Sequence, residues 1–141
     1  MWRVGLALSI SLGACGDSAP AGARCVTGLD LACKPLYQDT SFQTLFDRII
    51  RPTCASSAGQ CHTSGGHEAG LVLEDADAAH ALLRGTMGGR ARVTPGDPAC
   101  SLLVERLESG DPAFRMPPSS QPLSAAARCN FTLWIAQGAT R

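Results

Sequence analysis

The chain has 141 residues, with 12 basic and 12 acidic side chains and no net charge at neutral pH. This length suits one compact domain with short appendages, and the balanced charge argues against a nucleic-acid surface. Four Phe, two Trp and one Tyr are its only aromatic residues, so the core that the protein itself can build is expected to be modest.

The N-terminal residues 1–14 predict a secretory signal peptide. Arg3 supplies a positive charge, and residues 4–12 are apolar but too few to span a bilayer. The run Leu12-Gly13-Ala14-Cys15 resembles the lipobox of bacterial lipoproteins, which implies lipidation of Cys15. Acyl chains would anchor the exported protein to the cell membrane or outer membrane, facing the periplasm or the surface. The alternative is an ordinary signal peptide, with Cys15 incidental.

Six cysteines remain after Cys15, and an oxidising compartment would permit disulfides among them. They are Cys25, Cys33, Cys54, Cys61, Cys100 and Cys129. An even number fits complete pairing. Three disulfides are possible, or two disulfides and two cysteines bonded to a cofactor.

Residues 15–38 are expected to form a flexible tether, because small residues and Pro dominate its beginning without an apolar period. Cys25 and Cys33 bracket a short loop in this tether, which predicts a local disulfide between them. Elimination then leaves Cys100 and Cys129 to join two helices. The folded domain is expected to cover residues 39–141.

Hydrophobic spacing predicts about four short helices separated by long loops. Thr40 or Ser41 can cap the first helix, and Pro52 should end it. Asp75 and Asp97 are suitable caps for the second and third helices. The expected helices cover residues 41–50, 75–84, 98–107 and 124–138. This pattern predicts a small all-α domain.

The residue types that carry chemistry are concentrated in two runs. Cys54, Cys61 and His62 lie in Cys-Ala-Ser-Ser-Ala-Gly-Gln-Cys-His, and Met116 lies in Arg-Met-Pro-Pro. Two thiols can bond the edge of a haem, while an imidazole and a thioether take the two axial positions of its iron. The usual attachment run is C-x-x-C-H, but six residues separate these cysteines, so the intervening chain would have to bulge.

The order of these motifs, with Gly70-Leu71-Val72-Leu73, Pro95-Gly96-Asp97-Pro98 and Trp134-Ile135-Ala136-Gln137-Gly138, is similar to the cytochrome c-like domains common in planctomycetes and myxobacteria. The resemblance covers residues 41–139. It implies a class I cytochrome c fold with one covalent haem c, attached through Cys54 and Cys61. His62 would be the proximal iron ligand and Met116 the distal one.

The resemblance implies a membrane-anchored electron carrier in the cell envelope, with a redox protein as its partner. No P-loop or HExxH motif indicates a small-molecule substrate, so an enzyme is not expected. Pro117 and Pro118 would limit the motion of the loop that carries Met116.

Several alternatives stay open at this point. Cys54 and Cys61 could form a disulfide instead, leaving a cofactor-free, disulfide-stapled module that retains the fold and binds a partner at the envelope. A structural zinc site could use Cys54, Cys61, His62 and His67, although their spacing lacks the usual paired pattern. His67 or Met87 could replace Met116 as axial ligand. An open sixth position would allow a peroxidase-like enzyme.

Overall fold

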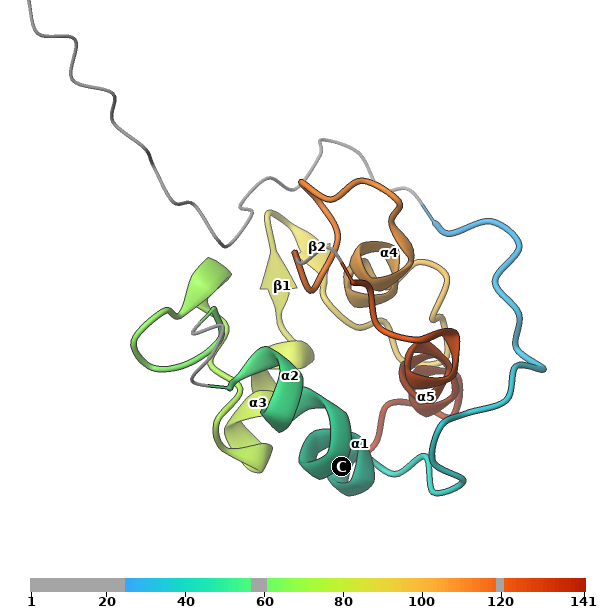
Figure 1. The fold of residues 1–141 in the computed structure, drawn as a ribbon, viewed down its shortest axis with the longest axis horizontal. Helices are drawn as coiled ribbons and strands as arrows, with labels where there is room; N and C mark the ends of the chain where they lie inside the picture. The colour runs from blue at the N-terminus through green and yellow to red at the C-terminus, as the bar shows by residue number, and fades with distance from the viewer. Residues whose placement is uncertain (1–24, 57–60, 119–120) are drawn as a thin grey trace, which may run out of the picture.

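The computed structural model describes residues 25–56, 61–118 and 121–141, and Figure 1 shows short helices separated by long loops. Within these three stretches, no helix combines the length and the apolar character that crossing a membrane requires. The elements are α1 (Phe42–Leu45), the π-helical η1 (Phe46–Ile50), α2 (Arg51–Cys54), the 3-10 helix η2 (Glu68–Gly70), α3 (Ala76–Leu83), β1 (Thr86–Met87), β2 (Arg90–Ala91), α4 (Leu102–Glu108) and α5 (Ala125–Ala136).

One continuous helical run, from α1 through η1 to α2, leads to the first of the clustered cysteines. Ser41 caps it by accepting a hydrogen bond over 3.3 Å from the backbone N–H three residues later. The prediction that Pro52 ends this helix is wrong, because Pro52 lies inside α2. In η1 the Arg51 N–H bonds to the Phe46 carbonyl, five residues back. This wider turn makes room for a proline ring, which would clash with the carbonyl of a regular helix.

Local capping explains where the later helices begin. Asp75 accepts a hydrogen bond at the start of α3, and Ser124 does so at the start of α5, both as the sequence predicts. The third helix begins later than expected, at Leu102. Asp97 instead accepts a hydrogen bond from the Cys100 N–H over 3.1 Å, and so caps a turn that precedes the helix.

The all-α prediction is wrong: the described chain is mainly helical but also contains a small antiparallel sheet. β1 and β2 pair with Met87 opposite Arg90. Gly88 and Gly89 form the turn between them, with φ of 56° and 78°, conformations that glycine adopts without a steric penalty. A two-residue Gly-Gly turn matches the twist of paired strands, so this hairpin has a clear local cause.

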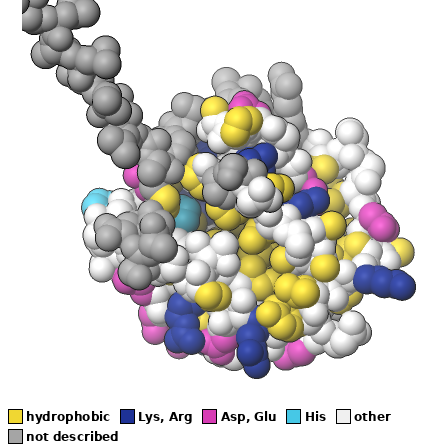
Figure 2. Space-filling view, in the orientation of Figure 1, with side chains coloured by type: hydrophobic (Ala, Val, Ile, Leu, Met, Phe, Trp, Pro, Cys, Tyr) yellow, Lys and Arg dark blue, Asp and Glu magenta, His cyan; other side chains and the backbone are white. Residues whose placement is uncertain are grey.

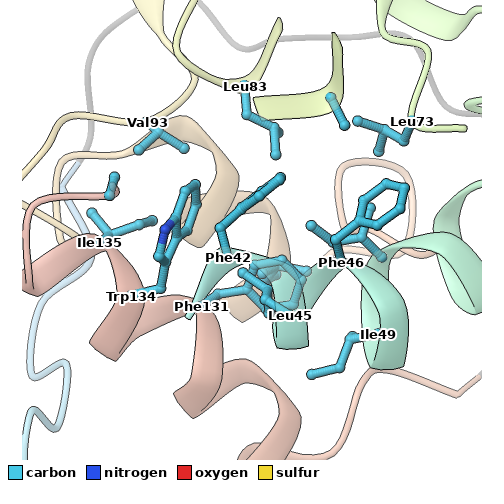
Figure 3. Packing of buried hydrophobic residues seen from close by; sticks show 14 of the residues in the cluster. Phe42, Leu45, Phe46, Ile49, Leu73, Leu83, Val93, Phe131, Trp134 and Ile135 are labelled. Atoms are coloured by element: carbon cyan, nitrogen blue, oxygen red, sulfur yellow. The ribbon is translucent and has the colours of Figure 1, made fainter. Parts of the chain in front are cut away.

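The core lies between the first helical run and α5 (Figure 3). The rings of Phe42 and Trp134 pack with their centroids 5.1 Å apart. Trp134 is 2% exposed, and its Nε1–H donates to the Thr140 carbonyl over 2.8 Å. Burial of these rings fixes α5 against α1. It therefore fixes the start of the helical run that ends at Cys54.

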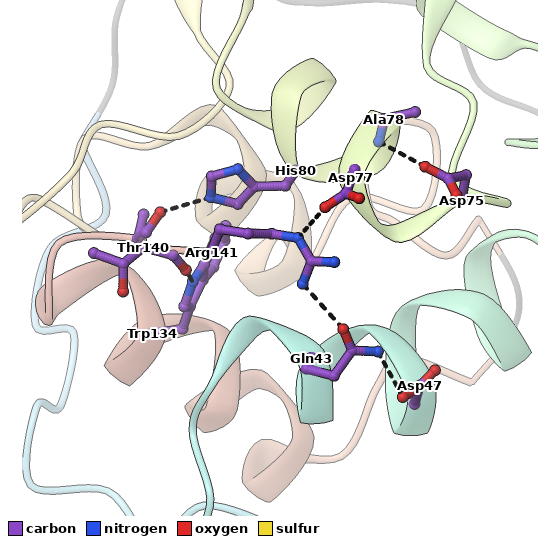
Figure 4. A network of polar contacts seen from close by, with 10 residues as sticks. Gln43, Asp47, Asp75, Asp77, Ala78, His80, Trp134, Thr140 and Arg141 are labelled. Atoms are coloured by element: carbon purple, nitrogen blue, oxygen red, sulfur yellow. Dashed lines mark hydrogen bonds and ion pairs between the residues drawn. The ribbon is translucent and has the colours of Figure 1, made fainter.

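A polar network lies around Arg141, on the same side of the domain (Figure 4). Arg141 donates to Asp77 over 2.6 Å and to Gln43 over 3.0 Å. His80 donates from Nε2 to the Ala139 carbonyl over 2.9 Å. These contacts join α1, α3 and the residues after α5, away from the clustered cysteines.

Two disulfides attach the segment before α1 to the rest of the domain. They join Cys25 to Cys100 and Cys33 to Cys129. The expected Cys25–Cys33 and Cys100–Cys129 pairings are therefore wrong, although the same four cysteines are used. Residues 25–38 begin beside residues 99–100 and reach α5 at their end (Figure 1), where the Leu36 N–H bonds to the Ala126 carbonyl over 2.9 Å. This contact brings each cysteine to a distant partner instead of to its neighbour in sequence.

Candidate functional site

A cavity of about 660 Å³ collects the candidate residues from separate parts of the chain. Cofactor sites in proteins span about 300–1,000 Å³ and are mostly apolar. Side chains from α2, α4, α5 and the loops between them line this cavity, and Figure 2 shows apolar side chains gathered on the face between α2 and α5. Cys54, Cys61, His62, Met87 and Met116 all contribute to the lining.

His62 is held in the form that binds a metal. Its Nδ1 lies 3.2 Å from the Leu71 carbonyl oxygen; because a carbonyl only accepts, Nδ1 carries the proton and Nε2 carries the lone pair. The His62 carbonyl in turn accepts from the Leu73 N–H over 2.8 Å. Burial lowers the pKa of His62, partly offset by the bond to Leu71 and by Glu68, and Arg106 lowers it further. The ring is therefore neutral.

Met116 enters the cavity from the loop that follows α4. Its backbone N–H donates to the Arg106 carbonyl over 3.0 Å, and the peptide bond to Pro117 is cis. Pro117 and Pro118 line the same cavity and restrict the backbone after the methionine. Met87 reaches this cavity from the β1–β2 hairpin, so two thioethers from unrelated segments share it.

The two cysteines of the cluster differ in state. Cys54 ends α2 as a free thiol, and removal from water raises its pKa to about 12. Cys61 is disulfide-bonded in this structure. The alternative of a Cys54–Cys61 disulfide is therefore wrong for this structure. Residues 57–60 of the connecting run, and Cys15, lie outside the described residues.

The other histidines have different surroundings. His67 is exposed in the loop before η2 and is absent from the cavity lining. His80 is a structural residue, because its ring packs against Phe42 and Trp134 and donates to Ala139. In the described parts of the chain, no three His, Cys, Asp or Glu side chains group closely enough to hold a metal ion, which gives the zinc alternative no support.

Two arginines that the sequence did not indicate as site residues, Arg92 and Arg106, line the cavity. Arg92 donates to the Leu82 carbonyl over 3.0 Å and to the Ala69 carbonyl over 2.9 Å. Arg106 is 7% exposed although charged. The sequence does contain an indication that Arg106 is buried. It directly precedes Leu107, and both lie on the buried side of α4. A buried cation in an apolar cavity favours a ligand that carries negative charge.

The donor set fits a haem. It combines an imidazole with an available Nε2, a thioether that can complete the axial pair, a thiol at the cavity wall, and guanidinium groups suited to carboxylates. The walls are otherwise mostly apolar, as a porphyrin ring requires.

Residues 59–120, a little under half of the chain, match the protein family described as planctomycete cytochrome C. The matched stretch contains Cys61, His62, Met87 and Met116, whereas Cys54 precedes it. No curated protein and no solved structure matches the chain. The family match supports a cytochrome c-like domain of the planctomycete type and confirms the resemblance that the order of motifs predicts. It favours an electron carrier over an enzyme.

Proposed function

We propose that this cytochrome c-like domain of the planctomycete type binds one haem c and carries electrons in the bacterial cell envelope. The observation that carries the proposal is the convergence of Cys54, His62 and Met116 on one cavity of about 660 Å³. A bound haem would supply a one-electron couple between ferric and ferrous iron.

His62 would be the proximal ligand and Met116 the distal one. The Leu71 carbonyl keeps the His62 ring oriented and in the tautomer with an available Nε2. A His/Met pair raises the reduction potential, and the cavity walls are mostly apolar.

Cys54 and Cys61 would form the covalent attachment. The Cys54 thiol is protonated at neutral pH because its pKa is raised to about 12, which protects it from oxidation before attachment. Attachment at Cys61 would use its thiol in the reduced form, whereas Cys61 is disulfide-bonded in this structure.

We also propose that the protein is exported and anchored through lipid on Cys15, and that it exchanges electrons with a redox protein. The lipobox-like run ending at Cys15 supports the anchor. The two disulfides between Cys25, Cys33, Cys100 and Cys129 support an oxidising compartment.

A second candidate function is a cofactor-free, disulfide-stapled binding module that keeps the cytochrome c-like fold. The two disulfides that staple the segment before α1 to the rest of the domain favour it. In that case the cavity would hold a different apolar ligand, or serve only as part of a binding surface.

The deciding experiment is expression of the full chain with the c-type haem maturation proteins. The mature protein should gain the mass of one haem, and its haem spectrum should survive acidic organic extraction. Peptide mapping should find the haem on Cys54, on Cys61 or on both. A colourless product with no added mass would overturn the haem proposal and leave the cofactor-free module.

A further inference from the structure

Arg106 lines the candidate haem cavity, and its guanidinium holds the loop that carries Met116. Its Nη1 donates to the Phe114 carbonyl over 3.3 Å, and its guanidinium carbon lies 4.6 Å from the centre of the Phe114 ring. Arg106 is 7% exposed and Phe114 is 8% exposed. A cation over an aromatic face is attracted more strongly where water is excluded, so these contacts fix the backbone two residues before Met116.

The backbone of Arg106 holds the methionine itself. The Arg106 carbonyl accepts the Met116 N–H over 3.0 Å. Arg106 belongs to α4, whose buried face packs against α5. Arg106 therefore hydrogen-bonds to the loop at two points. Its side chain bonds to Phe114, and its main chain bonds to Met116.

We propose that Arg106 is the positioning residue for Met116, and that its side chain determines whether the methionine thioether occupies the sixth coordination position. The consequences of this inference for the haem-bound protein rest on the proposed function. The guanidinium also brings a buried positive charge to the cavity wall, where it favours the ferrous form over the ferric form. Loss of the side chain should therefore lower the reduction potential by both routes.

The test compares Arg106→Met, which removes the charge at similar length, with Arg106→Lys, which keeps the charge without the planar fork. Arg128→Met is the matched control, because Arg128 also pairs with α4, through Glu108 at 2.9 Å, but does not line the cavity. In the haem-loaded protein, Arg106→Met should lose the charge-transfer band of Met-ligated ferric haem and have a lower midpoint potential. Arg106→Lys should recover part of both, and Arg128→Met should retain both.

A second measurement uses the haem-free protein, so that the inference can be judged even if the proposed function fails. Amide hydrogen exchange at Met116 should become about tenfold faster in Arg106→Met, equal to about 1.4 kcal/mol of local stability, and stay unchanged in Arg128→Met. A colourless wild-type protein would count against the haem alone. Unchanged exchange at Met116 in Arg106→Met, or an intact Met-ligated spectrum in the loaded variant, would overturn the positioning role.

Discussion

The Nδ1–H of His62 donates to the carbonyl oxygen of Leu71 across 3.2 Å, which ties the candidate iron ligand to the backbone of a buried leucine. Replacing His62 with Ala should abolish the low-spin haem spectrum, because the proximal position loses the imidazole that lines the cavity. Absorption spectra of the purified variants would measure this loss. His67→Ala is the control, since His67 is exposed and lies outside the cavity lining. Equal loss in both variants would contradict the assignment.

The buried, neutral state of His62 predicts a pH dependence of stability in the haem-free protein. Burial lowers the pKa of His62 in the folded state from 6.5, so the unfolded state binds the proton first as the pH falls. The free energy of unfolding should decrease from about pH 6.5 downward, until the pH passes the lower folded-state pKa. Urea unfolding across this range would measure the slope, and His62→Gln should reduce it. An identical slope in the variant would show that other groups cause it.

The two methionines of the cavity should differ in their effect on the haem. Met116→Ala should remove the Met-ligated ferric spectrum and lower the midpoint potential, because the thioether of a His/Met pair raises it. Met87→Ala should keep the spectrum, since no proline follows it on the hairpin turn. Redox titration with absorption spectroscopy would distinguish them. The reverse result would assign the sixth position to Met87.

The disulfide pairing predicts which peptides remain joined before reduction. Non-reducing digestion should yield Cys25 linked to Cys100 and Cys33 linked to Cys129. Replacing both Cys33 and Cys129 with Ser should lower the free energy of unfolding by about 3–4 kcal/mol, as expected for a long closed loop. Urea unfolding measures this change, and Cys54→Ser, which removes a free thiol, serves as control. Recovery of a Cys25–Cys33 peptide would contradict the pairing.

Local signals predicted some helix starts, but they failed at Pro52, which lies inside α2, and at Asp97, which caps a turn before α4. Asp75 and Ser124 mark helix starts correctly because a cap acts within one turn. The Gly88-Gly89 pair is a hairpin signal, because both glycines adopt the positive φ that a two-residue turn requires. The cysteine pairing depends on the path of residues 25–38 from residues 99–100 to α5, and spacing holds no information on that path. For the site, Cys54, His62 and Met116 were predictable by residue type, whereas Arg106 acquires its importance only through its contact with Phe114.

The two disulfides have a mechanical consequence. Their rings overlap, because Cys33 lies inside the ring closed by Cys25 and Cys100, while Cys129 lies beyond it. In a chain held at its N-terminal end, a pulling force would pass at Cys25 into the segment before α4, and at Cys33 into α5. The helical run that carries Cys54 is bypassed by both covalent routes. A force applied at the N-terminal end would therefore reach α5 and the segment before α4 without first passing through the helical run that carries Cys54.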